Sequence, residues 1–345
     1  MKQLIIFFGL TLFTLTSCSG NKNETKIKKK AIAFKTDLRN NRSERNQSQL
    51  FTKDVNLFKL YDLEENIGKK IGFVSLSDKY RLSDHEDSLA IPNLSNIKDS
   101  KELQFFTLSP KYRKRFLDKT GISESDSLFI YDYSRNELLS FPIKMLNATA
   151  NLSVYSYGEE DLTQYDYEIG FAIDKKLLEG LDESYNYNLV YVGQNNPFVK
   201  RQMKSIVWKK ISSKEFPLIK IKLSRKIKGT INTNHYLYET DNYKYYLKDI
   251  NDTVNVEYID KRHLMIVEKT NGKVIIERLF KVSEGTSITP LNFGTSDFIE
   301  QWTGKLLKER PDVVFGFEYF SFGCENIIFI NPKENDIYIN CDNRH

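Results

Sequence analysis

From residue 213 onward the sequence is a succession of short apolar segments separated by turn residues, and this pattern restricts the fold most. Asn271-Gly272 is the clearest turn signal, because both residues tolerate the positive φ of a type I′ turn. It predicts a hairpin between Leu264–Lys269 and Lys273–Val282. A helix is expected at Asp297–Lys308. Further strands are predicted at Leu218–Leu223, His235–Glu239, Tyr243–Lys248 and Val254–Tyr258. Residues 213–345 are therefore expected to form a β-rich, mostly antiparallel domain.

Residues 51–212 mix strand and helix signals. Ser109-Pro110 is typical of a helix start, with a capping residue followed by proline at the first helical position, and Gly121 ends the same helix. Ser127–Tyr133 and Leu138–Leu146 flank a polar turn and predict a hairpin. The fold class expected is α+β, with a mixed domain over 51–212 that precedes the β-rich domain.

A cluster of tyrosines marks the β-rich half. If Asp241-Asn242 is a two-residue turn, alternate residues of the flanking strands share a face and Glu239 lies opposite Lys244 on the other face. The shared face then carries Tyr236, Tyr238, Tyr243 and Tyr245. These rings are candidates for stacking on a sugar or a peptide, since they offer flat apolar area with a polar tip. The alternative is that the face packs into the core of the domain.

Cys324 and Cys341 are candidates for a disulfide in an oxidising compartment. They bracket a predicted hairpin of Asn326–Asn331 and Asp336–Asn340, in which 326 lies opposite 341. Cys324 then lies two residues beyond the position opposite Cys341, so a shorter loop or a bulge near Gly323 is needed to join them. The alternative is a pair of reduced, buried thiols.

The N-terminus has the pattern of an export signal. One positive charge at Lys2 precedes the apolar stretch Leu4–Leu15, which is much shorter than the roughly 20 residues that span a bilayer as a helix. We therefore expect residues 1–17 to be a signal peptide.

The four residues Leu15-Thr16-Ser17-Cys18 resemble the lipobox of bacterial lipoproteins. The resemblance implies that the Cys18 thiol receives a diacylglycerol, that the leader is cut before Cys18, and that the new amine is acylated, for example with palmitate. Because each buried methylene contributes about 0.8 kcal/mol, two or three chains hold a protein on a membrane almost permanently. Ser19 favours the outer over the inner membrane. The alternative is a secretory signal cut near Ser17 or Ser19.

Charge separates the anchor segment from the body. Of the formal charge of +5, Lys2 contributes one and residues 18–50 contribute six, so residues 51–345 carry −2. A nearly neutral body argues against a nucleic-acid partner, because phosphate recognition needs a basic face. Residues 18–50 are interpreted as a flexible basic tether, and the run 28–30 either remains solvated or attracts anionic head groups.

No catalytic, metal or nucleotide motif is recognisable. The histidines are His85, His235, His263 and His345, without metal-ligand spacing. We therefore predict neither a metal nor a cofactor. Enzymes that use two carboxylates leave no such motif, so a carboxylate-based hydrolase stays open among 46 acidic residues.

Together these observations favour a lipid-anchored lipoprotein of the cell envelope that acts as a non-catalytic binding or assembly module for a protein or a glycan. One alternative is an inhibitor or immunity lipoprotein directed against a toxin or a lytic enzyme. The other is the hydrolase, which a deep pocket lined by convergent carboxylates would favour.

Overall fold

The structure, a computed structural model, describes residues 55–63, 70–80, 90–154, 156, 162–217, 233–252, 258–295 and 299–342. All of these residues belong to one compact unit of the chain. The expected signal peptide, Cys18 and the tether lie outside the described residues. So do the predicted strand 218–223 and most of the strand predicted at 254–258.

The fold is β-rich, and its sheets are antiparallel. One five-stranded sheet has the order β1-β2-β7-β6-β3 and a three-stranded sheet has the order β5-β4-β8. The predicted hairpin of residues 127–146 is confirmed as β4 and β5. The bounds are Tyr61–Asp62 (β1), Ile71–Ser75 (β2), Phe105–Thr107 (β3), Ser127–Asp132 (β4), Glu137–Pro142 (β5), Asn147–Leu152 (β6), Tyr167–Asp174 (β7) and Asn188–Gly193 (β8).

Helix α3 spans Pro110–Thr120, as the sequence predicts. Proline fits the first turn because its missing N–H would have no partner there, and Gly121 ends the helix with φ +69°. The expected capping bond from the Ser109 side chain is absent. The other helices are short: Ser100–Gln104 (α2) and the 3-10 turns Leu94–Asn96, Ile143–Met145, Gln164–Asp166 and Lys175–Leu178. No helix within the described ranges is long and apolar enough to cross a membrane.

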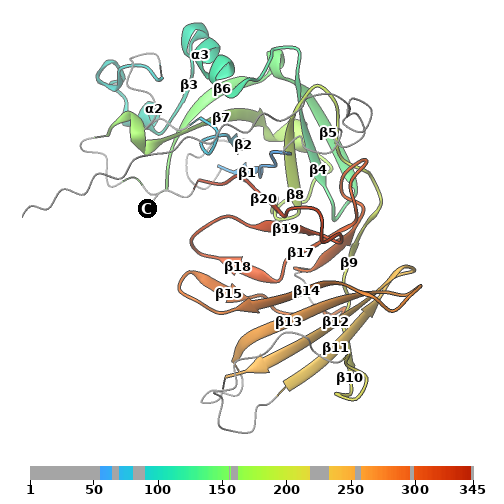
Figure 1. The fold of residues 1–345 in the computed structure, drawn as a ribbon. Coiled ribbons are helices and arrows are strands. Elements are labelled where there is room, and N and C mark those ends of the chain that lie inside the picture. The colour runs from blue at the N-terminus through green and yellow to red at the C-terminus, as the bar shows by residue number, and fades with distance from the viewer. Residues whose placement is uncertain are drawn as a thin grey trace, which may run out of the picture. The chain divides into compact units, whose positions relative to one another are not determined.

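A second five-stranded sheet has the order β10-β11-β12-β13-β14, and its strands run side by side in Figure 1. The predicted register is confirmed, with Tyr238 opposite Tyr245 and Glu239 opposite Lys244. Alternation of apolar residues fixes this register, because a slip by one residue would turn the core face outward. The bounds are Lys209–Ile211 (β10), Thr233–Glu239 (β11), Tyr243–Asn251 (β12), Ile259–Glu268 (β13) and Val274–Lys281 (β14).

The hairpin of β13 and β14 is confirmed, but its turn differs from the prediction. The Glu268 N–H donates to the Lys273 carbonyl, and the Gly272 N–H donates back to the Glu268 carbonyl, so the loop has four residues. Gly272 has φ +70°, whereas Asn271 is not among the positive-φ residues. The Asn271 side chain instead accepts the Lys273 N–H at 2.8 Å, which favours this longer loop over a type I′ turn.

The remaining strands form a five-stranded sheet, β20-β19-β17-β16-β9, and the pair β15-β18. Strand β9 pairs with β16 and β10 pairs with β11, so strands that precede residue 213 share sheets with strands that follow it. The bounds are Met203–Ser205 (β9), Thr286–Ile288 (β15), Trp302–Gly304 (β16), Val313–Phe315 (β17), Glu318–Phe320 (β18), Asn326–Phe329 (β19) and Ile337–Tyr338 (β20).

The predicted helix Asp297–Lys308 is wrong in its described part, where β16 lies between β9 and β17. The Gln301 side chain is fully buried and donates to the carbonyls of Pro290 and Gly316. Gly304 has φ +135°, which is outside the helical region. Tertiary pairing therefore overrides the local helix signal.

Candidate functional site

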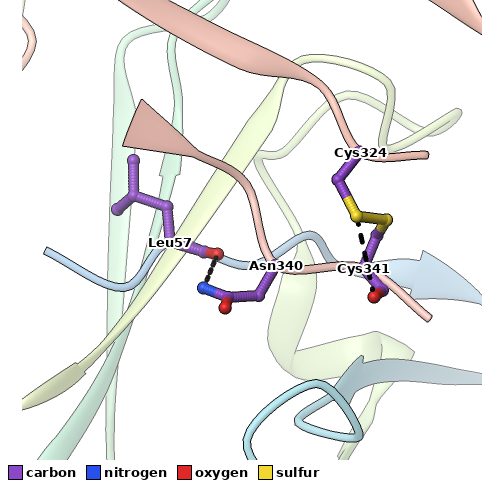
Figure 2. Close-up of a disulfide and its surroundings, with 4 residues drawn as sticks. All are labelled: Leu57, Cys324, Asn340 and Cys341. Carbon is purple, nitrogen blue, oxygen red and sulfur yellow. Dashed lines mark hydrogen bonds between the residues drawn. A yellow bond between two sulfur atoms is a disulfide. The ribbon is translucent and has the colours of Figure 1, made fainter. Parts of the chain in front are cut away.

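The predicted C-terminal disulfide is confirmed, and it lies next to Glu325, which lines the candidate cavity. The Cα atoms of Cys324 and Cys341 are 5.6 Å apart. Figure 2 shows the bond beside Asn340, whose side-chain amide donates to the Leu57 carbonyl at 2.8 Å. The C-terminal segment is thereby tied to a segment near the start of the described chain.

The predicted register of this hairpin is wrong by three residues. Asn326 lies opposite Tyr338, not opposite position 341, so Cys324 is one residue from facing Cys341. Pairing between β19 and β20 ends at Ile327 and Ile337, so the loop between the two strands is longer than the four residues that the prediction assumed. Gly323, with φ +103°, lets the chain turn next to Cys324.

The tyrosine face of β11 and β12 lies against a core cluster that includes Trp208 and Ile328. Tyr245 is 1% exposed, and its hydroxyl shares a hydrogen bond of 2.9 Å with the Thr303 hydroxyl. Burial raises the pKa of Tyr245. Tyr236 is also buried, and Tyr238 and Tyr243 are half-buried. The structure therefore brings the four rings together at the core, and their ligand-stacking role stays a prediction.

A separate cavity of about 330 Å³ combines aromatic rings with acidic groups. Its walls come from segments far apart in the sequence: the loops before β1, after β4 and before β8, the approach to β16, and the stretch from β17 to β19. The lining residues are Lys59, Tyr133, Asn186, Tyr187, Thr289, Ile299, Glu300, Phe315, Gly316, Glu318, Tyr319, Phe320 and Glu325.

Two glutamates in this cavity have perturbed acidity. Glu300 stays accessible to solvent, yet burial raises the pKa of its carboxyl, the charge of Glu325 adds to this, and Lys59 opposes it. Burial also raises the pKa of Glu318, against a hydrogen bond from the Lys281 backbone. Neither carboxylate forms a salt bridge with any residue that the structure describes. Both therefore lack a direct ion pair, and for Glu300 the more distant charge of Lys59 only partly offsets the effect of burial.

The third glutamate, Glu325, is paired. Its carboxylate lies 3.2 Å from the Lys59 ammonium, and the Lys59 side chain is 14% exposed. Among the described residues of the cavity wall, Lys59 is the single cationic side chain. Three glutamates and one lysine leave an excess of two formal negative charges.

Tyr133 is a buried residue that lines the same cavity. The residue is 4% exposed, and its ring packs edge-on against Trp302 at 5.1 Å and Phe315 at 5.4 Å. Burial raises the pKa of Tyr133, and the nearby charge of Glu325 raises it further. The hydroxyl makes no hydrogen bond to the described part of the chain. It therefore has capacity for a partner from outside.

Close backbone approach positions Glu300. Gly316 has φ +88°, and a Cβ at this position would lie 1.9 Å from the Glu300 carbonyl oxygen. The Tyr187 hydroxyl accepts the Ile299 N–H at 3.1 Å and holds the preceding residue. Glycine is required here because any side chain would push the Glu300 segment away from β17.

Two of the four histidines, His235 and His263, lie in the part of the chain that the structure describes. His263 is fully buried, with its Nε2 atom 3.1 Å from Glu277, and burial lowers its pKa. His235 lies on the same sheet, and its pKa is lowered by burial as well. His85 and His345 lie outside the described residues. Among the residues that are described, no group of three or more side chains could hold a metal ion.

Sequence reasoning missed Lys59, Tyr133, Glu300, Glu318 and Glu325, since no spacing links residues that meet only in the fold. No protein-family model, curated protein or solved structure matches the chain. The interpretation of the cavity therefore rests on its own chemistry.

Proposed function

We propose that this protein is a lipoprotein of the bacterial cell envelope, anchored by lipid on Cys18 and exposed to its partner as a binding or assembly module. The proposal includes export by the leader 1–17, retention at the outer membrane and a basic tether over 18–50. It also includes a mixed α+β domain over 51–212 ahead of the β-rich domain. The lipobox residues and the near-neutral body support it.

The ligand site of this module is the acidic, aromatic-lined cavity. The observation that carries the proposal is the combination of Glu300 and Glu318, without salt bridges among the described residues, with the buried residue Tyr133 in one concave wall. Polar groups that leave water without a partner cost free energy, and a ligand that pairs with them recovers it. The ligand is a protein or a glycan of the envelope.

A photo-crosslinking experiment tests this site in cells. A photoreactive phenylalanine analogue replaces Tyr319, which lines the cavity and is 62% exposed, and the control carries it at Tyr338, which is 67% exposed and does not line the cavity. We expect a discrete envelope adduct at Tyr319 that the added substitutions Glu300→Gln and Glu318→Gln abolish. The same adduct at Tyr338, or one unaffected by the glutamines, would contradict the site.

The anchor has its own test. The variant Cys18→Ala should lose label from a palmitate analogue and move into the soluble fraction, since the thiol is the atom that takes the lipid. A Cys18→Ala protein that is still labelled and membrane-bound would contradict the anchor.

The raised pKa of Glu300 favours one second candidate, the carboxylate-based hydrolase. A carboxyl with a raised pKa is suited to donate a proton to a leaving group, and a second carboxyl such as Glu325 would serve as base or nucleophile. This candidate predicts that chitotetraose or purified cell-wall glycan is cleaved, and that Glu300→Gln lowers the rate by at least about a hundredfold. If the glycan binds and is not cleaved, the hydrolase is rejected and the binding module remains as the function.

A further inference from the structure

We propose that the cavity takes a cationic side chain, the ammonium of a lysine or the guanidinium of an arginine, presented by a basic segment of a partner protein. This inference rests on the proposed function, because it names the ligand class of the same site. It distinguishes a basic peptide from a neutral glycan.

The charge of the cavity wall favours a cationic ligand. The cavity wall holds Glu300, Glu318 and Glu325 against Lys59, and Lys59 lies 3.2 Å from Glu325. Glu300 and Glu318 are left without a salt bridge to any described residue. A ligand cation would restore the balance, whereas a neutral sugar would desolvate both carboxylates and leave their charge unpaired.

Aromatic rings are the second argument. Tyr187, Tyr319 and Phe320 line the cavity together with the glutamates. A ring face carries negative electrostatic potential and attracts an ammonium or a guanidinium within about 6 Å of its centroid. Carboxylates and ring faces in one wall therefore favour the same sign of ligand charge.

The hydroxyl of Tyr133 is the third argument. It belongs to a residue that is 4% exposed, and its oxygen has no donor among the described residues. A lysine ammonium carries three N–H donors, which this oxygen and the two glutamates together could accept. The volume of about 330 Å³ is at the small end for ligand pockets, which suits one long side chain with its flanking backbone.

A titration with defined peptides tests the proposal. The full-length protein, purified in a nonionic detergent, is titrated with capped pentalysine, with the same peptide acetylated on every side-chain amine, and with chitotetraose. Isothermal calorimetry gives each dissociation constant. We expect binding of pentalysine, no measurable binding of the acetylated peptide, and weakening as the salt concentration rises.

Two double variants with equal charge change separate the cavity from general electrostatics. Glu300→Gln with Glu318→Gln should weaken pentalysine binding about tenfold or more. Glu179→Gln with Glu183→Gln, two exposed glutamates outside the cavity wall, should leave binding within about twofold. Tyr133→Phe removes one hydroxyl and should weaken binding roughly threefold, and it keeps the test valid if the first variant folds poorly.

Equal losses in both double variants would overturn the proposal, because they would show attraction to the whole surface. Absence of pentalysine binding to the unchanged protein would overturn it as well. Binding of chitotetraose that depends on Glu300 and Glu318, with none of pentalysine, would reject the cationic ligand but keep the cavity as the binding site. If no ligand binds and no adduct forms at Tyr319, both the cationic ligand and the cavity as the binding site are rejected.

Discussion

Two aromatic regions of this protein contrast in what their polar atoms do. On the tyrosine face of β11 and β12, the rings pack against a core cluster and the Tyr245 hydroxyl is paired with Thr303 at 2.9 Å. In the cavity, Tyr133 is also buried, but its hydroxyl makes no hydrogen bond in the described chain, and Glu300 and Glu318 form no salt bridge there. Aromatic content is thus common to both regions, and the hydroxyl without a partner beside carboxylates without a salt bridge distinguishes the candidate site.

The largest expected effect comes from Tyr245→Ala. It removes a buried ring and the hydroxyl that pairs with Thr303, so we expect a loss of about 3–5 kcal/mol in the free energy of unfolding. Tyr319→Ala, at an exposed ring of the cavity, should change stability by less than about 0.5 kcal/mol. Urea unfolding measures both. Equal destabilisation by the two changes would remove the distinction between the regions.

Replacing both Cys324 and Cys341 by serine should have the next largest effect. The bond closes a loop with a sequence separation of 17, for which chain entropy predicts a loss of about 3 kcal/mol. Since Glu325 follows Cys324 directly, the cavity should change while the tyrosine face does not. Hydrogen exchange of β19 and β12 checks this. Exchange that rises in β12 before it rises in β19 would show that the disulfide stabilises the tyrosine face and not the cavity.

Gly316→Ala should cost about 1–3 kcal/mol, because alanine is strained at φ +88° and its Cβ would collide with the Glu300 carbonyl. We expect this change to weaken pentalysine binding as well, since it moves Glu300. The matched control is Gly121→Ala, at φ +69° with open space around the Cβ, which should destabilise without affecting binding. If Gly316→Ala binds pentalysine as the unchanged protein does, the close contact between Gly316 and the Glu300 backbone does not position Glu300.

The smallest effect is a pH dependence. Because the folded-state pKa values of Glu300 and Glu318 are raised above the unfolded values, the fold loses stability as pH rises through that window and is weakest above it. Glu300→Gln with Glu318→Gln should therefore raise the melting temperature at pH 7 by less than about 2 °C. The gain should vanish near pH 4. A lower melting temperature at pH 7 would show instead that the charged glutamates stabilise the fold.

Local signals in the sequence predicted what local interactions determine. Proline at position 110 and glycine at position 121 were enough for α3, and the turn at Asp241-Asn242 was enough for the register of β11 and β12. Prediction failed where a distant strand decides. Residues 302–304 became β16 because β9 and β17 flank them, and the register next to the disulfide follows a loop longer than the predicted one.

The candidate site could not be predicted from the sequence for the same reason. Its residues range in sequence from Lys59 to Glu325, and none of them belongs to a recognisable sequence motif. Glu300 and Glu318 are two of 46 acidic residues, and only their place in the cavity wall and their raised pKa values distinguish them. Aromatic spacing, by contrast, is visible in a sequence. It looks the same whether the rings belong to a hydrophobic core or to a binding site.

The most direct test of the central claim is a carboxyl ¹³C titration of Glu300 and Glu318 by NMR, with and without capped pentalysine. In the free protein we expect both carboxyls to titrate above the ordinary pKa of a glutamate. Pentalysine should lower the pKa of both cavity carboxyls, because a bound cation stabilises the charged form. Identical titration curves for the cavity carboxyls with and without the peptide would contradict a cation-binding site.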